Sequence, residues 1–147
     1  MNISMVAFES WLESAANYEK QKKHGEFSLK TMALLANQLD NPQLDYDTIH
    51  VAGSKGKGSV STMCSYILNM YGFSDGLYTS PHILNFLERI SSSNGQFSKN
   101  LYEEAAAELV QFIENTSDEL EKMNFSQASW FELITLFAFI VFNILLI

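Results

Sequence analysis

The stretch Thr48-Ile49-His50-Val51-Ala52-Gly53-Ser54-Lys55-Gly56-Lys57-Gly58-Ser59 decides how this chain is interpreted. A short apolar run leads into a glycine-rich turn with two lysines, and a helical pattern of apolar residues follows at once. Glycines let successive backbone N–H groups of such a turn point inward, while a lysine and the helix N-terminus supply positive charge. The order of strand, turn and helix therefore predicts a cradle for phosphate groups at residues 53–59.

This turn departs from the general phosphate-loop pattern G-x-x-x-x-G-K-[ST]. Gly56 and Lys57 fit the pattern, but Val51 stands where its first glycine belongs. Gly58 occupies the hydroxyl position, so the hydroxyl comes one residue later, at Ser59. The alternative is a lysine-rich surface turn between a strand and a helix. The intact strand and helix on either side favour the phosphate site.

The helix predicted after the turn carries an apolar face and ends near Gly72, a common C-terminal stop. Its apolar residues are Val60, Met63, Cys64, Ile67, Leu68 and Tyr71. Cys64 is the chain's single cysteine. We expect it to be a buried small hydrophobe, because one cysteine builds neither a disulfide nor a zinc site.

Length and composition limit the possible functions. With 147 residues and 47% hydrophobic content, the chain can form one domain with a respectable core. Its formal net charge of −8 argues against a general nucleic-acid surface but is compatible with ATP, which needs only a local positive pocket. The N-terminus has no basic segment ahead of an apolar run, which is unlike a signal or transit peptide and favours the cytoplasm.

A second strand is predicted at residues 73–79, followed by a loop that begins Ser80-Pro81-His82. Two strands joined by a crossover helix form a parallel unit, so the predicted fold is α/β with a parallel sheet and flanking helices. Ligands of such sheets gather at the C-terminal strand ends, where both the turn and this loop would lie. Ser80 could then ligate Mg²⁺, although ordinary turn chemistry explains Ser80 and His82 equally well.

The remaining segments are mainly predicted helices. Two are expected at residues 1–23 and 28–39, the second stopped by Asn41-Pro42. His24, which has no partner at metal-ligand spacing, is expected at the end of the first. A tight turn at residues 91–95 precedes a helix capped by Ser98 or Asn100, and residues 115–128 are predicted to be a loop.

The C-terminal segment begins with Ser129 and Glu132, which have the spacing of a capping box. From residue 133 to the last residue the chain is apolar except for Thr135 and Asn143. A membrane span needs roughly 20 apolar residues, and this run is shorter. A buried helix packed on the sheet is the preferred interpretation, and a tail anchor is the alternative.

Two motifs at this separation resemble the folylpolyglutamate synthase/dihydrofolate synthase family of the Mur ligase group. They are Val-Ala-Gly-Ser-Lys-Gly-Lys-Gly-Ser from Val51, and Gly-Leu-Tyr-Thr-Ser-Pro-His-Ile-Leu-Asn-Phe-Leu-Glu-Arg-Ile from Gly76. Asn41-Pro42-Gln43 and Phe131-Glu132 also match the family. Leu87 departs from it, since relatives usually carry a polar or basic residue there.

The resemblance implies ATP-dependent addition of L-glutamate to dihydropteroate or a folate through an acyl phosphate. It assigns the ATP phosphates to residues 53–59, with Lys57 on the outer phosphates as the catalytic residue, and Mg²⁺ to Ser80. The loop from Ser80 to Arg89 would border the pterin, with His82 and Arg89 as substrate-binding residues. For Arg89, a salt bridge with a neighbouring acid at a strand end is equally consistent.

The family also implies parts that these 147 residues lack: a later glutamate-containing motif of the magnesium site and a C-terminal glutamate-binding domain. We therefore expect residues 1–147 to be a partial ATP-binding domain, an incomplete copy that by itself does not catalyse the reaction. The alternative is a non-catalytic remnant or a membrane-tethered interaction protein. Pteroate and folate acceptors are not distinguished by the sequence, and neither is the oligomeric state.

Overall fold

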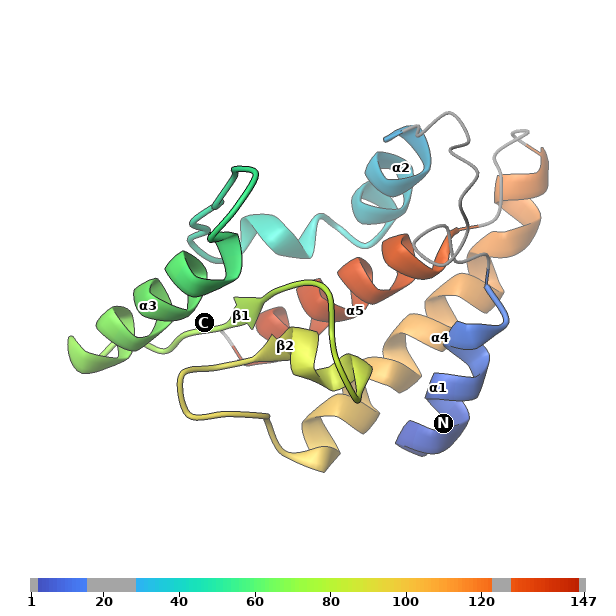
Figure 1. The fold of residues 1–147 in the computed structure, drawn as a ribbon. Helices are drawn as coiled ribbons and strands as arrows, with labels where there is room; N and C mark the ends of the chain where they lie inside the picture. The colour runs from blue at the N-terminus through green and yellow to red at the C-terminus, as the bar shows by residue number, and fades with distance from the viewer. Residues whose placement is uncertain (1–2, 16–28, 123–127, 146–147) are drawn as a thin grey trace.

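The computed structural model describes residues 3–15, 29–122 and 128–145 (Figure 1). Its helices are α1 (Met5–Glu13), α2 (Lys30–Gln38), α3 (Lys57–Met70), α4 (Lys99–Lys122) and α5 (Trp130–Leu145). Two short 3-10 helices are η1 (Pro42–Leu44) and η2 (Phe86–Arg89), and two short strands are β1 (Leu77–Tyr78) and β2 (Ile90–Ser91).

Helix α5 forms the centre of the core. It packs against α4, α1 and η1, and nine of its sixteen residues are buried. Ser129 and Glu132 begin it with the predicted capping box: the Glu132 carboxylate accepts from the Ser129 backbone N–H at 2.8 Å, and the Ser129 hydroxyl accepts from the Glu132 N–H. The prediction of a buried C-terminal helix is confirmed.

Helix α4 starts where the sequence predicts and ends later. The Ser98 hydroxyl accepts the Leu101 N–H, so Ser98 rather than Asn100 is the cap. The prediction of a loop at residues 115–128 is wrong for residues 115–122, because the helix continues to Lys122, and residues 123–127 lie outside the described residues. Residues 115–122 contain no glycine or proline, and good helix formers such as Leu120 and Glu121 extend the preceding turns at little cost.

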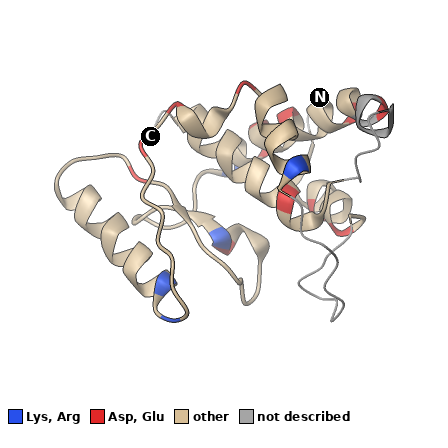
Figure 2. Ribbon diagram, turned by 90° about the horizontal axis from the view of Figure 1, so that it is seen from above, with Lys and Arg blue, Asp and Glu red and all other residues tan. Residues whose placement is uncertain are grey.

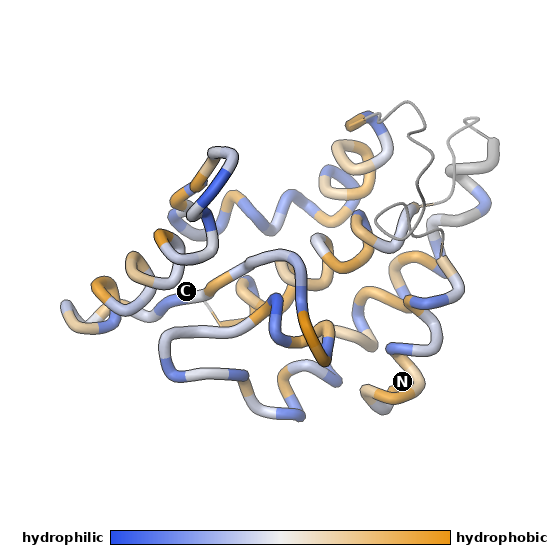
Figure 3. Tube along the Cα trace, viewed as in Figure 1, coloured by the Kyte–Doolittle hydropathy of each residue, from blue (hydrophilic) through white to orange (hydrophobic). Residues whose placement is uncertain are grey.

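Helix α3 is confirmed as a helix but not as a buried one. Among the described residues its apolar face is mostly uncovered, and its one buried residue is Ser65. The exposed fractions are 47% for Val60, 63% for Met63, 53% for Ile67 and 79% for Tyr71. Cys64 is half-buried rather than buried. Figure 1 shows α3 set apart from the cluster of α1, α4 and α5, and Figure 3 shows that it carries hydrophobic segments there.

The sheet differs from the predicted parallel one. The two strands of the described residues pair antiparallel, with Leu77 opposite Ser91 and Tyr78 opposite Ile90. The apolar run at residues 48–52 has no partner strand in the described part of the chain and is not a strand; Ile49 is 62% exposed. A strand exists only when its backbone N–H and C=O groups are paired with a neighbour. The apolar run at residues 48–52 is therefore not enough to predict a strand.

The turns follow the sequence more closely. Asn41 adopts the left-handed conformation and Pro42 begins η1, which ends α2 where the sequence predicts. Ser92 and Gly95 exchange backbone hydrogen bonds of 2.9 and 3.0 Å in the predicted tight turn. The first predicted helix, over residues 1–23, ends early, because α1 stops at Glu13 with Ser14 as its C-cap. Residues 16–23 and His24 lie outside the described residues.

In the part of the chain that the structure describes, no helix has both the length and the hydropathy that crossing a membrane demands.

Candidate nucleotide-binding site

The turn before α3 has the backbone conformation that a phosphate cradle needs. Gly53 and Gly56 have positive φ values of 151° and 74°, a region that L side chains rarely adopt. Gly56 is also the N-cap of α3, in the left-handed conformation. These two glycines let the chain reverse direction and enter the helix directly.

Lys57, the first residue of α3, closes the turn. Its Nζ donates a hydrogen bond to the Gly53 carbonyl oxygen at 2.7 Å. The first N–H groups of a helix have no acceptor within the helix, and they give its N-terminus a partial positive charge. The Lys57 ammonium group therefore lies where the helix already favours an anion.

The space outside the turn is open. A Cβ atom added at Gly56 or Gly58 would meet no atom within 4 Å, and residues 53–59 are all exposed. Figure 2 shows basic residues at the turn and at the start of the following helix, which itself contains no acid. Lys55 and Lys57 thus make a local positive site in a chain of net charge −8, and a triphosphate has room to enter.

Ser80, the predicted magnesium ligand, is exposed in the loop after β1. No group of three or more His, Cys, Asp or Glu side chains suited to a metal ion occurs among the described residues. Magnesium binds through one or two protein oxygens together with substrate phosphates in many nucleotide sites. A hydroxyl such as that of Ser80 fits an ion that arrives with the triphosphate, and it does not hold one by itself.

The structure places His82 and Arg89 together. The Arg89 Nε donates to His82 Nδ1 at 2.8 Å, and the guanidinium carbon lies 4.8 Å from the centre of the Trp130 ring. Arg89 is only 1% exposed, whereas His82 is half-buried. This geometry ties the loop after β1 to the first residue of α5. A substrate contact of either residue stays a prediction.

Glu88 organises the same loop, a role that the sequence reasoning missed. Its carboxylate accepts the backbone N–H groups of Ile83, Leu84 and Asn85 at 2.8 to 2.9 Å. These hydrogen bonds lower the pKa of Glu88. Glu88 follows Asn85 by three residues, which is a capping-box spacing, so the signal was present in the sequence.

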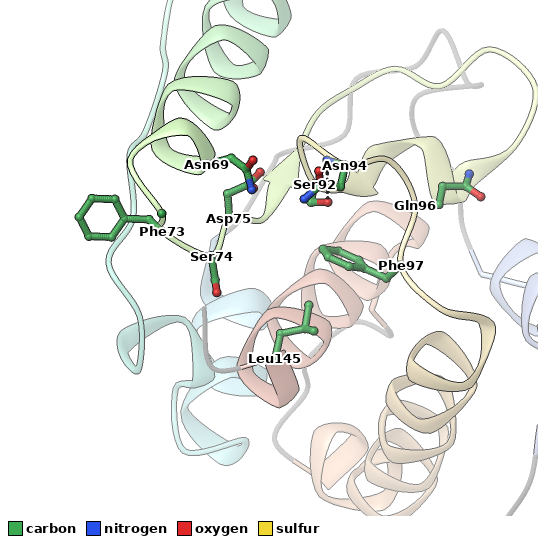
Figure 4. Close-up of a pocket in the computed structure, with 10 residues that line it drawn as sticks. Asn69, Phe73, Ser74, Asp75, Ser92, Asn94, Gln96, Phe97 and Leu145 are labelled. Atoms are coloured by element: carbon green, nitrogen blue, oxygen red, sulfur yellow. Dashed lines mark hydrogen bonds between the residues drawn. The ribbon is translucent and has the colours of Figure 1, made fainter.

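The cavity of about 520 Å³ lies away from the turn, at the other end of α3 (Figure 4). The carboxylate of Asp75 lines it but is already engaged: it accepts from the Ser65 hydroxyl, and from the backbone N–H and hydroxyl of Ser93 at 2.7 Å each. Asp75 therefore ties α3 to the turn after β2. The open surface at the turn before α3 is the better candidate for an anion.

A glycine turn, a lysine and a helix N-terminus in this order make a candidate phosphate site of the kind found in nucleotide-binding α/β proteins. No family model matches the chain. Dihydrofolate synthase/folylpolyglutamate synthase of Buchnera aphidicola subsp. Schizaphis graminum is 32% identical over 143 residues, covering 97% of this chain and 31% of that protein. The chain spans about a quarter to a third of the length of the curated relatives it matches.

Solved structures similar to this chain come from the same family. The crystal structure of folylpolyglutamate synthase from Thermotoga maritima has a TM-score of 0.72 and 32% identity, covering 94% of this chain and 30% of that one. Mycobacterium tuberculosis folylpolyglutamate synthase complexed with ADP and AMPPCP has a TM-score of 0.77 and 27% identity, covering 94% and 28%. The chain belongs to the folylpolyglutamate synthase/dihydrofolate synthase family, with the Mur ligase fold, and corresponds to part of its members' length.

Proposed function

We propose that residues 1–147 form part of the ATP-binding domain of a ligase that joins L-glutamate to dihydropteroate or a folate. In that reaction a carboxylate oxygen of the acceptor takes the γ-phosphoryl group of ATP, and ADP leaves. The amine of glutamate then attacks the acyl phosphate, an amide forms, and phosphate and a proton are released. Phosphoryl transfer asks a protein mainly for positioning and for neutralisation of charge.

The observation that carries this proposal is the turn itself. Gly53 and Gly56 in positive-φ conformations, the Lys57 ammonium 2.7 Å from the Gly53 carbonyl, and the N-terminus of α3 converge on one open surface. We assign the phosphates to Gly53, Ser54, Lys55, Gly56, Lys57, Gly58 and Ser59. Lys57 would contact the outer phosphates.

We also propose that Ser80 is a ligand of the Mg²⁺ ion that accompanies ATP. When bound, the ion would neutralise part of the phosphate charge. The hydroxyl of Ser80 is exposed beside the end of β1, where it would add one oxygen ligand. His82 and Arg89 are proposed on the acceptor side, in the loop that Glu88 organises.

Binding of Mg-ATP by the variant Lys57→Ala tests the proposal. A hydrogen bond to a charged group contributes about 1.5–3 kcal/mol, so we expect roughly a 10- to 100-fold loss of affinity, measured by isothermal titration calorimetry. Lys99→Ala is the matched control, because Lys99 is an exposed lysine on α4, paired with Glu103 at 3.4 Å. Equal affinity in Lys57→Ala and wild type would contradict the proposal.

Gly56→Ala provides a second test of the backbone's role. A Cβ at this position meets no atom within 4 Å, so the substitution acts through the positive φ alone. A left-handed conformation costs a residue with a Cβ about 1–2 kcal/mol. We expect weaker Mg-ATP binding and a free energy of unfolding lowered by no more than that cost. Gly95→Ala is the control, since Gly95 also has a positive φ and open space for a Cβ but lies in the turn after β2.

The non-catalytic or membrane-tethered alternative is not favoured. Its main support in the sequence was the apolar C-terminal segment, and α5 is instead buried at the centre of the core. The matches to folylpolyglutamate and dihydrofolate synthases cover nearly all of this chain.

A further inference from the structure

The hydrogen bond between Arg89 and His82 fixes the position of a proton. Arg89 Nε is always a donor, because the guanidinium group has no acceptor and does not lose its charge in proteins. His82 Nδ1, at 2.8 Å, must therefore accept through its lone pair. A neutral imidazole that accepts at Nδ1 carries its proton on Nε2. His82 then offers a donor at Nε2 and no acceptor there.

Trp130 holds both partners in place. The guanidinium carbon of Arg89 lies 4.8 Å from the Trp130 ring centre, and the His82 ring lies 5.9 Å from it at an interplanar angle of 41°. Arg89 and Trp130 are 1% and 2% exposed. Because Trp130 is the first residue of the capped and largely buried helix α5, the imidazole lies against a side chain of the core.

Glu88 fixes the backbone that carries His82. The Glu88 carboxylate accepts hydrogen bonds from the backbone N–H groups of the three residues that follow His82, which are Ile83 to Asn85. Two consecutive residues of opposite charge thus hold the loop: Glu88 through the backbone and Arg89 through the imidazole. His82 as a residue is half-buried, so part of its surface is open to solvent.

We propose that Arg89 is a positioning residue that fixes His82 as its Nε2–H tautomer, and that this N–H donates a hydrogen bond to a carboxylate or carbonyl oxygen of the acceptor substrate. The second part rests on the proposed function, whereas the first concerns the folded chain alone. The role of Arg89 in this proposal is to fix the tautomer and the orientation of the His82 ring.

The tautomer is measured by long-range ¹H–¹⁵N correlation spectroscopy of the histidine rings, with His82 assigned from His82→Gln. We expect a protonated Nε2 and an unprotonated Nδ1 for His82 at neutral pH. In Arg89→Met, with folding checked by circular dichroism, a mixture of tautomers should replace the single one. A protonated Nδ1 in the wild-type chain overturns the proposal even if the variant does not fold, and so does an unchanged tautomer in a folded variant.

The donor is tested with a matched pair of amide substitutions. The side-chain amide of His82→Gln reaches about where Nε2 lies, whereas that of His82→Asn reaches only to the position of Nδ1. With 7,8-dihydropteroate as the probe and Mg-ATP present, we expect His82→Gln to bind within about threefold of wild type and His82→Asn to lose about tenfold, the value of one hydrogen bond. Equal affinities in the two variants, or no binding by wild type, overturn the donor role.

These experiments separate the two proposals. The ring spectrum requires neither nucleotide nor acceptor, so a failure of Mg-ATP binding would leave the tautomer result standing. Conversely, a wrong tautomer would leave the phosphate site at residues 53–59 untouched.

Discussion

Helices α5 and α3 are both rich in apolar residues, yet the structure uses them in opposite ways. Nine residues of α5 are buried, whereas α3 buries only Ser65 and leaves Val60, Met63 and Ile67 about half exposed or more. The α5 region contains the core, and the α3 region contains the candidate phosphate site. Apolar periodicity identified both helices but could not tell which one is covered.

The difference teaches that stability and ligand binding are largely separate in this chain. The α3 region is joined to the rest by polar contacts, such as those of Asp75, and by two pairs of strand residues. Substitutions in α5 should therefore unfold the chain, while substitutions on α3 should leave it folded. The following predictions test that separation.

The largest effect is expected from Phe137→Ala in α5. Phe137 is fully buried, and its ring lies 4.7 Å from that of Phe8 and 6.2 Å from that of Tyr102. Replacing a buried phenylalanine by alanine leaves a cavity and costs about 3–5 kcal/mol. Urea denaturation followed by circular dichroism should show this loss, and a variant that does not fold counts as the same outcome.

Met63→Ala is the matched apolar truncation on α3. Since Met63 is 63% exposed, we expect a change in the free energy of unfolding within about 0.5 kcal/mol. A loss from Met63→Ala as large as that from Phe137→Ala would refute the contrast between the two helices.

Asp75→Ala should have the next largest effect, because it removes the polar connection between the regions. The substitution leaves the buried hydroxyl of Ser65 and the N–H of Ser93 without their acceptor. An unsatisfied buried polar group costs about 1–3 kcal/mol. Hydrogen exchange should quicken in α3 more than in α5. Asp45→Ala is the control: it removes an exposed carboxylate that accepts from Asn143 at 2.7 Å, and it should lower the free energy of unfolding less. Equal decreases in the two variants would argue against a connecting role for Asp75.

Ser129→Ala should lower the free energy of unfolding less than Phe137→Ala or Asp75→Ala, since it removes only the N-cap of α5. Loss of a serine cap typically costs about 0.5–2 kcal/mol, and Ser129 is buried with its hydroxyl on the Glu132 carboxylate at 2.8 Å. Thermal denaturation would show a lower midpoint. Ser98→Ala, at the cap of α4, is the comparison, and the exposed Ser98 should matter less.

The smallest effect is expected from acidification at Glu88. Its pKa in the folded chain lies below the ordinary value because three backbone N–H groups donate to the carboxylate. A carboxyl group whose pKa is lowered by folding stabilises the fold above its unfolded pKa, and this stabilisation is lost as the pH falls through the folded pKa. The amides of Ile83, Leu84 and Asn85 should therefore lose protection from exchange at low pH. Glu88→Gln should abolish that pH dependence, and its persistence would show that another group is responsible.

The sequence predicted the elements better than their surroundings. Local signals were sufficient for the turn at residues 53–59, the cap at Ser129, the stop at Asn41-Pro42 and the turn that ends at Gly95, because each depends on a few neighbouring residues. The end of α4 differs from the prediction, because the polar residues after 114 suggest a loop although most of them are helix formers.

Long-range features were less accessible. Whether residues 48–52 form a strand depends on a partner, which local sequence does not specify. The burial of Arg89 on Trp130 joins residues 41 positions apart, so no spacing rule could reveal it. The role of Glu88 could have been found, since Asn85 and Glu88 carry a capping-box spacing within the motif.

The bond between Lys57 and the Gly53 carbonyl has a consequence for ligand choice. An arriving phosphate would exchange a neutral acceptor for an anionic one at the same ammonium group, so the gain depends on ligand charge rather than on a base or a sugar. Added salt should diminish that gain at an exposed site. Inorganic triphosphate should then compete with the nucleotide at this turn, and adenosine should not.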